Sequence, residues 1–184
     1  MVRANASAVK SEDDLAYNFP APGKYLAVVK DGEELNDRVQ VQFECLAGTV
    51  PGQTGKELRE RFGKEEAHEK RITRLLMVTH LLNPGEDKDV DIKTAIGRPL
   101  VIEVVKSKDG KYHNLAYMGM WRTSHPDVAD VMAIPDVKRA YDKLVEAYKA
   151  GKAGPNGNPA MAPAAAPVQQ QPVAAAAGNP WENV

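Results

Sequence analysis

The middle of the chain carries two kinds of side chain that together can bind a phosphate-linked strand of bases: cations and flat aromatic rings. The set comprises Arg59, Arg61, Lys106, Lys108, Lys111, Tyr112, Tyr117 and Trp121. Cations attract phosphates, and aromatic rings stack on bases with little regard to which base it is. The same residues also have a plainer use, in which the rings fill a core and the lysines keep a hairpin tip soluble. Residue types alone leave both interpretations open.

The sequence offers little for catalysis or metal binding. His68 follows Glu65 at the spacing of a carboxylate–histidine metal pair, but no second such pair exists and the other histidines show no ligand spacing. No phosphate-binding glycine loop, nucleophile elbow or zinc-protease helix occurs. We therefore expect no metal, no cofactor and no enzymatic activity.

Hydrophobic periodicity predicts five strands and one helix between the third and the fourth. Alternation is clearest over residues 38–47, where Val39, Val41, Phe43 and Cys45 share one face. The other predicted strands are residues 23–30, residues 55–62 and the two arms of a hairpin over residues 100–121, which turns at Asp109 and Gly110. Residues 65–82 repeat apolar side chains at helical steps. This element order is typical of an oligonucleotide-binding (OB) barrel.

Local patterns add detail to these elements. Residues 31–37 are predicted to be a connecting turn, and residues 89–97 a short helical turn. The second arm of the hairpin alternates, with Leu115, Tyr117 and Trp121 on one face. On the helix, Lys70, Arg71 and Arg74 share part of one surface, where they would either contact phosphate or be solvated.

Four segments follow from these patterns, and the predicted class is all-β with added helices. Residues 1–16 form a flexible arm, residues 17–122 the OB-like nucleic-acid-binding domain, residues 123–150 a helical extension, and residues 151–184 a disordered Ala/Pro/Gln tail. The stripe over residues 136–150 predicts a helix. This helix would pack on the barrel or serve as a self-association surface, for instance in a dimer.

The tail ends in a peptide that contains an isolated tryptophan. Trp181 has no predicted fold around it to support, so it would serve as an anchor in a partner's pocket or be only a chain end. In the first interpretation, Glu182 and the terminal carboxylate of Val184 would meet basic residues of the partner.

Charge and cysteine content restrict the setting. The formal net charge is −1, so any affinity for nucleic acid must come from local clusters and would be moderate and sensitive to salt. Cys45, the single cysteine, excludes an internal disulfide and fits a reducing cytoplasm, and its apolar neighbours predict a buried, inert thiol. The apolar runs at residues 75–78 and 100–105 are far shorter than the roughly 20 residues of a membrane-spanning helix, so no membrane role is expected.

Short motifs spread from about Tyr17 to Trp121 suggest a relationship. They are Pro22-Gly23-Lys24-Tyr25, Leu46-Ala47-Gly48, the strand over residues 55–62, the leucine-rich helix, Ile96-Gly97-Arg98-Pro99-Leu100-Val101 and Lys111-Tyr112-His113-Asn114. Together they resemble a phage-associated family of small OB-fold single-stranded-DNA-binding proteins, long catalogued as a domain of unknown function. The tail layout is similar to that of bacterial single-stranded-DNA-binding proteins, although it has one acid and ends in Val184 where a terminal Phe would be expected.

This resemblance implies sequence-independent binding of single-stranded DNA in replication, recombination or repair, within a bacterial or phage-infected cell. It also implies that replication or recombination proteins bind the C-terminal tip. The alternative is an OB-like interaction module that holds such a protein without touching nucleic acid. The near-zero charge favours this alternative, whereas Arg59, Arg61 and the hairpin lysines favour DNA binding.

Overall fold

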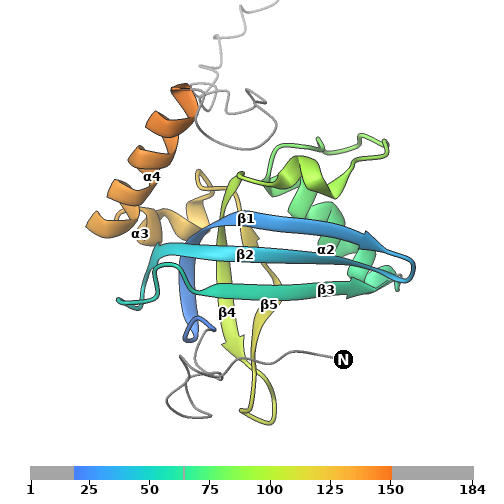
Figure 1. The fold of residues 1–184 in the computed structure, drawn as a ribbon, viewed down its shortest axis with the longest axis horizontal. Helices are drawn as coiled ribbons and strands as arrows, with labels where there is room; N and C mark the ends of the chain where they lie inside the picture. Colours follow the sequence, from blue (N-terminus) through green and yellow to red (C-terminus); the bar gives the residue numbers. More distant parts are fainter. Residues whose placement is uncertain (1–18, 64, 151–184) are drawn as a thin grey trace, which may run out of the picture.

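The computed structural model describes residues 19–63 and 65–150. At its centre lies a five-stranded antiparallel sheet in the order β3-β2-β1-β4-β5. The strands are β1 (Gly23–Leu35), β2 (Arg38–Gly48), β3 (Glu57–Gly63), β4 (Pro99–Lys106) and β5 (His113–Trp121). The sheet is curled, so that β1, β2 and β3 run across β4 and β5, and α2 (Glu66–Val78) covers one end (Figure 1). The predicted order of strands and helix is confirmed.

β1 is the long central strand of the sheet. Residues 23–28 pair with β4, whereas the rest of the strand pairs only with β2. Register shifts between Leu26 and Ala27 and between Val29 and Asp31 interrupt the ladder with β2, as bulges that bend a strand do. The connecting turn predicted at residues 31–37 was wrong, because residues 31–35 continue this ladder and only Asn36 and Asp37 form the turn. Most of the polar side chains there are exposed, so solvent tolerates them on the strand.

The hairpin between β4 and β5 turns where the sequence predicts. The Gly110 N–H donates to the Ser107 carbonyl at 2.9 Å, and Gly110 has a φ of +70°, a left-handed conformation that glycine adopts at little cost. The Asp109 carboxylate accepts hydrogen bonds from the Ser107 hydroxyl and the Lys111 N–H, which fastens the turn.

β5 does not alternate as predicted. Val104 of β4 pairs with Leu115 and Ile102 pairs with Met120, so β5 inserts extra residues between these two pairs. Met118 lies in this bulge with a φ of +58°. Leu115 and Met120 are therefore buried while Tyr117 is exposed, and the prediction that Leu115 and Tyr117 share a face was wrong.

α2 ends at Val78, before the predicted limit of residue 82. His80 has a φ of +58°. The His80 N–H donates to the Met77 carbonyl at 3.2 Å, and the Leu81 N–H donates to the Leu76 carbonyl at 2.8 Å. These two bonds form a Schellman motif, which satisfies the last carbonyls and turns the chain away from the helix axis.

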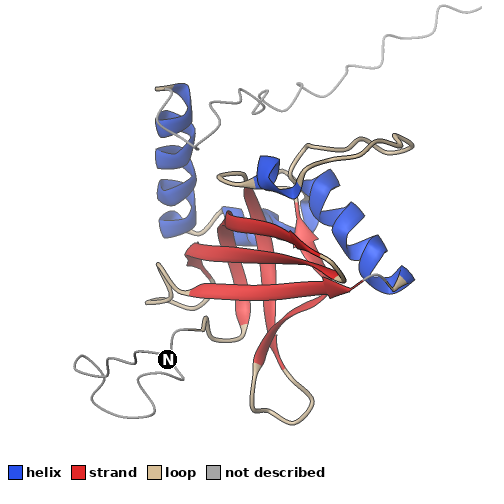
Figure 2. Ribbon diagram, turned by 45° about the vertical axis from the view of Figure 1, so that its right-hand side comes forward, coloured by secondary structure: helices blue, strands red, loops and turns tan. Residues whose placement is uncertain are grey.

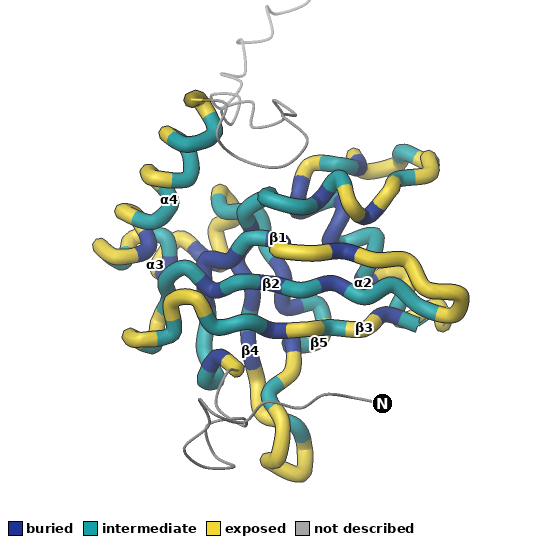
Figure 3. Tube along the Cα trace, in the orientation of Figure 1, coloured by how far each residue is buried: buried dark blue, intermediate teal, exposed yellow. Residues whose placement is uncertain are grey.

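Apolar side chains form two clusters on opposite faces of the sheet. The larger cluster lies inside the curl and includes Tyr25, Phe43, Phe62, Leu75 and Met120. Buried positions alternate with more exposed ones along β2 and β3 in Figure 3, whereas β1 and β4 each contain three buried residues in a row, where both faces of the sheet are packed.

The second cluster joins the outer face of the sheet to the helices that follow β5. Leu26 and Val101 pack there against Val128, Val131 and Val137. The helical elements are η2 (Pro126–Val128), α3 (Ala129–Met132) and α4 (Pro135–Lys149). The predicted C-terminal helix is confirmed, and its first turns pack on the sheet while the rest projects away (Figure 2).

Two further predictions concern the connections and the termini. The helical turn predicted at residues 89–97 is confirmed as η1 (Ile92–Ala95), which the Asp91 carboxylate caps by accepting from the Lys93 N–H at 2.9 Å. The arm predicted at residues 1–16 and the tail at residues 151–184, with Trp181, Glu182 and Val184, lie outside the described residues.

Candidate nucleic-acid interface

β3 presents its two arginines on the outer face of the curled sheet. Arg59 and Arg61 are both exposed, because alternation turns their neighbours into the core. The Arg59 Nη2 donates to the Gln42 side-chain oxygen at 3.3 Å, and the Arg61 Nε donates to that of Gln40 at 3.1 Å. These neutral partners orient the guanidinium groups without neutralising them.

Acidic side chains on the same face are compensated by one lysine. The Lys30 ammonium contacts the carboxylates of Glu57 and, at 3.3 Å, Glu44. Its hydrogen bond to Glu57 lowers the pKa of that carboxyl. The face therefore carries both signs of charge, and its arginines are the cations that form no ion pair with a carboxylate of the described residues.

The hairpin tip carries the predicted lysines and one predicted ring. Lys106, Lys108 and Lys111 are exposed, and none of them forms an ion pair within the described part of the chain. Tyr112 is 65% exposed. Its backbone is fixed at the base of the turn by hydrogen bonds to Ser107, which leaves the ring free in solvent.

Glu60 lies inside the curl, where the two edge strands and α2 meet. Its side chain points inward from β3 and pairs with Arg71 of α2 at 3.0 Å, and the Leu115 backbone of β5 lies near enough to favour the charged form of its carboxylate. Burial raises the pKa of the Glu60 carboxyl, although the Arg71 charge opposes this. We call the join between β3 and β5 at Glu60 and Leu115 the seam.

The seam brings Arg59 and Arg61 close to β5. Each arginine is the direct neighbour of Glu60, whose carboxylate reaches Leu115. Tyr117 is two residues beyond Leu115 and is 68% exposed. The seam is thus flanked by two cations on one strand and by an exposed ring on the other.

Arg71 lies in the interior, unlike Lys70 and Arg74. Its side chain is 8% exposed, and its guanidinium carbon lies 5.0 Å from the centroid of the Phe62 ring. Among the residues that the structure describes, its Nε and Nη2 have no hydrogen-bond partner. The predicted surface shared by these three residues was wrong, because the larger cluster draws the Arg71 stem inward.

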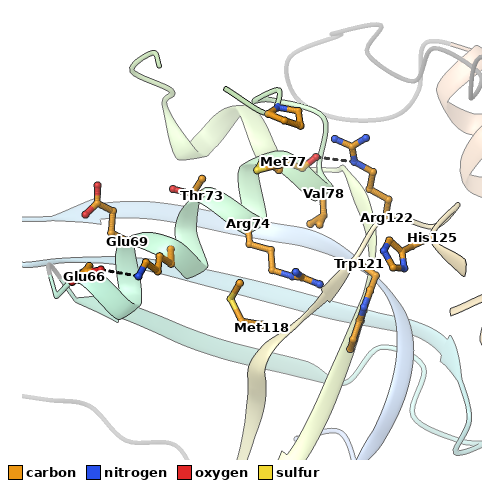
Figure 4. Close-up of a pocket in the computed structure, with 12 residues that line it drawn as sticks. Glu66, Glu69, Thr73, Arg74, Met77, Val78, Met118, Trp121, Arg122 and His125 are labelled. Atoms are coloured by element: carbon orange, nitrogen blue, oxygen red, sulfur yellow. Dashed lines mark hydrogen bonds and ion pairs between the residues drawn. The ribbon is translucent and has the colours of Figure 1, made fainter. Parts of the chain in front are cut away.

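Trp121 lies apart from the other predicted rings, in a groove between α2 and β5. The Lys24 ammonium lies 5.2 Å and the Arg74 guanidinium carbon 5.8 Å from the centroid of its ring. The groove has a volume of about 660 Å³. Arg74, Met77, Val78, Met118, Trp121 and Arg122 are among the residues that line it (Figure 4).

Two arginines tie the walls of this groove together. The Arg74 Nε donates from α2 to the Met120 carbonyl at 2.8 Å, and the Arg122 Nε donates back to the Met77 carbonyl at 3.1 Å. Arg122 was not predicted as a site residue, because no periodic pattern marks a residue that follows a bulged strand. Arg74 was named, but its contact with Trp121 depends on how α2 packs against β5.

The structure therefore divides the predicted residues into three groups. Arg59, Arg61 and Tyr117 flank the seam, Lys106, Lys108, Lys111 and Tyr112 form the hairpin tip, and Trp121 lines the groove. Over residues 19–63 and 65–150, no three histidine, cysteine or acidic side chains are grouped to hold a metal ion. No helix in that part of the chain is long and apolar enough to cross a membrane.

The chain was compared with known proteins. No protein-family model matches it, and no curated protein matches its sequence.

Proposed function

We propose that this protein binds single-stranded DNA without regard to sequence, as an OB-like barrel whose binding face runs beside the seam. The observation that carries the proposal is that Arg59 and Arg61 of β3 face solvent and that β5, which meets β3 at the seam, carries the exposed ring of Tyr117. Phosphates would lie against the arginines and bases would stack on the ring, which is how sequence-tolerant strand binding works.

The strand order supports this proposal. The meander β1-β2-β3, the helix after β3, and the β4–β5 hairpin beside β1 follow the OB pattern. OB folds bind strands on the face of their second and third strands, flanked by the loops between strands 1 and 2 and between strands 4 and 5. In this chain the face of the second and third strands carries the Gln40–Arg61 and Gln42–Arg59 pairs. The loop between the fourth and fifth strands is the hairpin tip with its three lysines. The resemblance to the phage-associated family points the same way, toward DNA replication, recombination or repair.

Fluorescence anisotropy with labelled oligo-dT and a matched duplex, each at two salt concentrations, tests the proposal. Binding to oligo-dT should be stronger than binding to duplex and should weaken as salt rises. Equal affinity for both, or no binding to either, would contradict it.

The second candidate is an interaction module that holds a replication or recombination protein. The formal net charge of −1 favours this candidate, because the electrostatic gain from DNA is then limited to local clusters. The same anisotropy experiment separates the two functions, since the module alone would leave oligo-dT unbound.

A further inference from the structure

We propose that the groove between α2 and β5 is a second contact for the bound strand, with its phosphate at Arg74 and Arg122 and its base against Trp121 and Met118. This inference rests on the proposed binding of single-stranded DNA and adds a site to it. The groove is large enough for a nucleotide, because small-ligand pockets typically measure about 300–1,000 Å³ and this one about 660 Å³.

The arginines of the groove are positioned before any ligand arrives. Each uses its Nε to bind a backbone carbonyl on the opposite wall, Met120 for Arg74 and Met77 for Arg122. Over residues 19–63 and 65–150, the terminal nitrogens of both guanidinium groups form no hydrogen bond, and neither arginine forms an ion pair with a carboxylate. A guanidinium held in this way binds phosphate with little further loss of freedom.

Charge is distributed unevenly along the groove. Figure 4 shows Arg74, Arg122 and His125 around Trp121 at one end, and Glu66 and Glu69 at the other. Lys70 pairs with Glu66 at 2.7 Å, which compensates one of the acids. An anionic group is therefore favoured at the Trp121 end, where the neighbouring His80 also has a pKa lowered by burial and then by the charges of Arg122 and Arg98.

The groove continues the surface used in the proposed function. β5 leads from the hairpin tip, past the exposed ring of Tyr117, directly to Met118 and Trp121 in the groove. The strand would thus follow β5, and the apolar walls formed by Met77 and Val78 would exclude water from a base that packs beside Trp121 and Met118. A DNA strand fits this alternation of cations and rings, which is why we favour it over a peptide as the occupant.

Trp121 gives the experiment a local signal. The chain has two tryptophans, so Trp181→Phe in the full chain leaves Trp121 as the only one. Unlabelled oligo-dT added to this variant should change the Trp121 emission over the same concentrations at which labelled oligo-dT gains anisotropy. Anisotropy reports total binding, whereas the emission reports the groove.

Two substitutions in the groove should act in opposite directions. Thr73 lines the groove from α2, and Thr73→Glu places a carboxylate there, which should weaken oligo-dT binding about fivefold or more, the scale of one lost stacked base. Glu69→Gln removes a carboxylate and should tighten binding about twofold through one screened charge. Ala133→Glu adds the same charge at an exposed position between α3 and α4, away from the groove lining, and serves as the control.

The outcomes separate this inference from the proposed function. Suppose that oligo-dT binds by anisotropy, that the Trp121 emission does not change, and that Thr73→Glu and Ala133→Glu have the same affinity. The groove would then not contact DNA, and its occupant would be another molecule, such as a peptide. The binding function would then stand on the seam alone. No anisotropy change at all would overturn both. The groove is supported as a DNA contact if Thr73→Glu, but not Ala133→Glu, loses both oligo-dT binding and the emission change while its urea midpoint stays unchanged.

Discussion

The inner face of β3 carries a buried, paired charge, whereas its outer face carries two exposed charges. Facing inward, Glu60 is 14% exposed and lies between the Leu115 backbone and the Arg71 guanidinium. Facing outward, Arg59 and Arg61 donate hydrogen bonds to glutamine side chains and form no ion pair with a carboxylate in the described part of the chain, although the Arg59 charge acts on the nearby Glu57. The charge inside pairs with Arg71, whereas the charges outside remain available to a ligand.

This difference shows that one short strand can close the fold and present a binding surface at the same time. The inner charge pairs with α2 near the point where β3 meets β5, and the outer charges face solvent. The following predictions test the two faces separately.

The largest effect is expected on stability, from a substitution on the inner face of β3. Glu60→Ala leaves the Arg71 charge buried without its partner, so the free energy of unfolding should fall by about 3–5 kcal/mol. Urea denaturation measures this loss. Glu57→Ala on the outer face of the same strand is the matched control, and it should lose only a small part of that amount because its pair with Lys30 is partly solvated. Equal losses would contradict the assigned roles.

The second largest effect is expected on DNA binding, from substitutions on the outer face of β3. Arg59→Ala with Arg61→Ala should weaken oligo-dT binding about tenfold or more while leaving the urea midpoint nearly unchanged. Losing two phosphate contacts should also reduce the slope of log K against log salt by about 1.4, since each contact on a single strand contributes about 0.7. A salt titration by anisotropy gives this slope. The control is the pair of substitutions Gln40→Ala and Gln42→Ala, which removes the hydrogen-bond partners but keeps both charges and should preserve the slope. If the double arginine variant has a lower melting temperature but binds oligo-dT normally, the arginines are structural.

A smaller effect concerns the pH dependence of the inner charge. Burial raises the pKa of Glu60 above its ordinary value of 4.5, so the folded state holds this proton more tightly than the unfolded state does. The stability that this provides is complete below pH 4.5 and is lost as the pH rises through the folded-state value. Glu60→Gln keeps an acceptor for Arg71 but cannot titrate. The stability of the variant relative to the wild type should therefore improve from pH 4.5 toward neutrality, as measured by urea unfolding of both proteins; an opposite trend would mean that the Arg71 charge outweighs burial.

The smallest effect is expected at a second inward position. Burial raises the pKa of Cys45 to about 12, and the residue has no exposed surface. Its alkylation at neutral pH should therefore be almost undetectable in the folded protein and rapid in denaturant. Mass spectrometry after iodoacetamide treatment measures it. Rapid labelling of the folded chain would show that the β2 side of the curl opens readily.

Sequence patterns predicted the parts of the molecule that depend on alternation within one strand. The faces of β2 and β3, and with them the exposure of Arg59 and Arg61, follow from a period of two. The separation of Tyr117 from Leu115 could not be predicted in this way, because the bulge depends on the register of β5 against β4. The burial of Arg71 was equally hidden, since a long charged side chain can pass its stem through a core when it meets a buried carboxylate.

β1 pairs with one strand that is near in sequence and one that is distant, and this should determine how fast the chain folds. β1 joins β2 through a short turn, but it also pairs with β4, which follows much later in the sequence. Loop-closure entropy must be overcome before this distant pairing gains any energy, so folding is expected to take milliseconds to seconds, as in other barrels rich in non-local contacts. The β1-β2-β3 meander and the β4–β5 hairpin would form early, and their docking along Tyr25 and Ile102 would be the slow step.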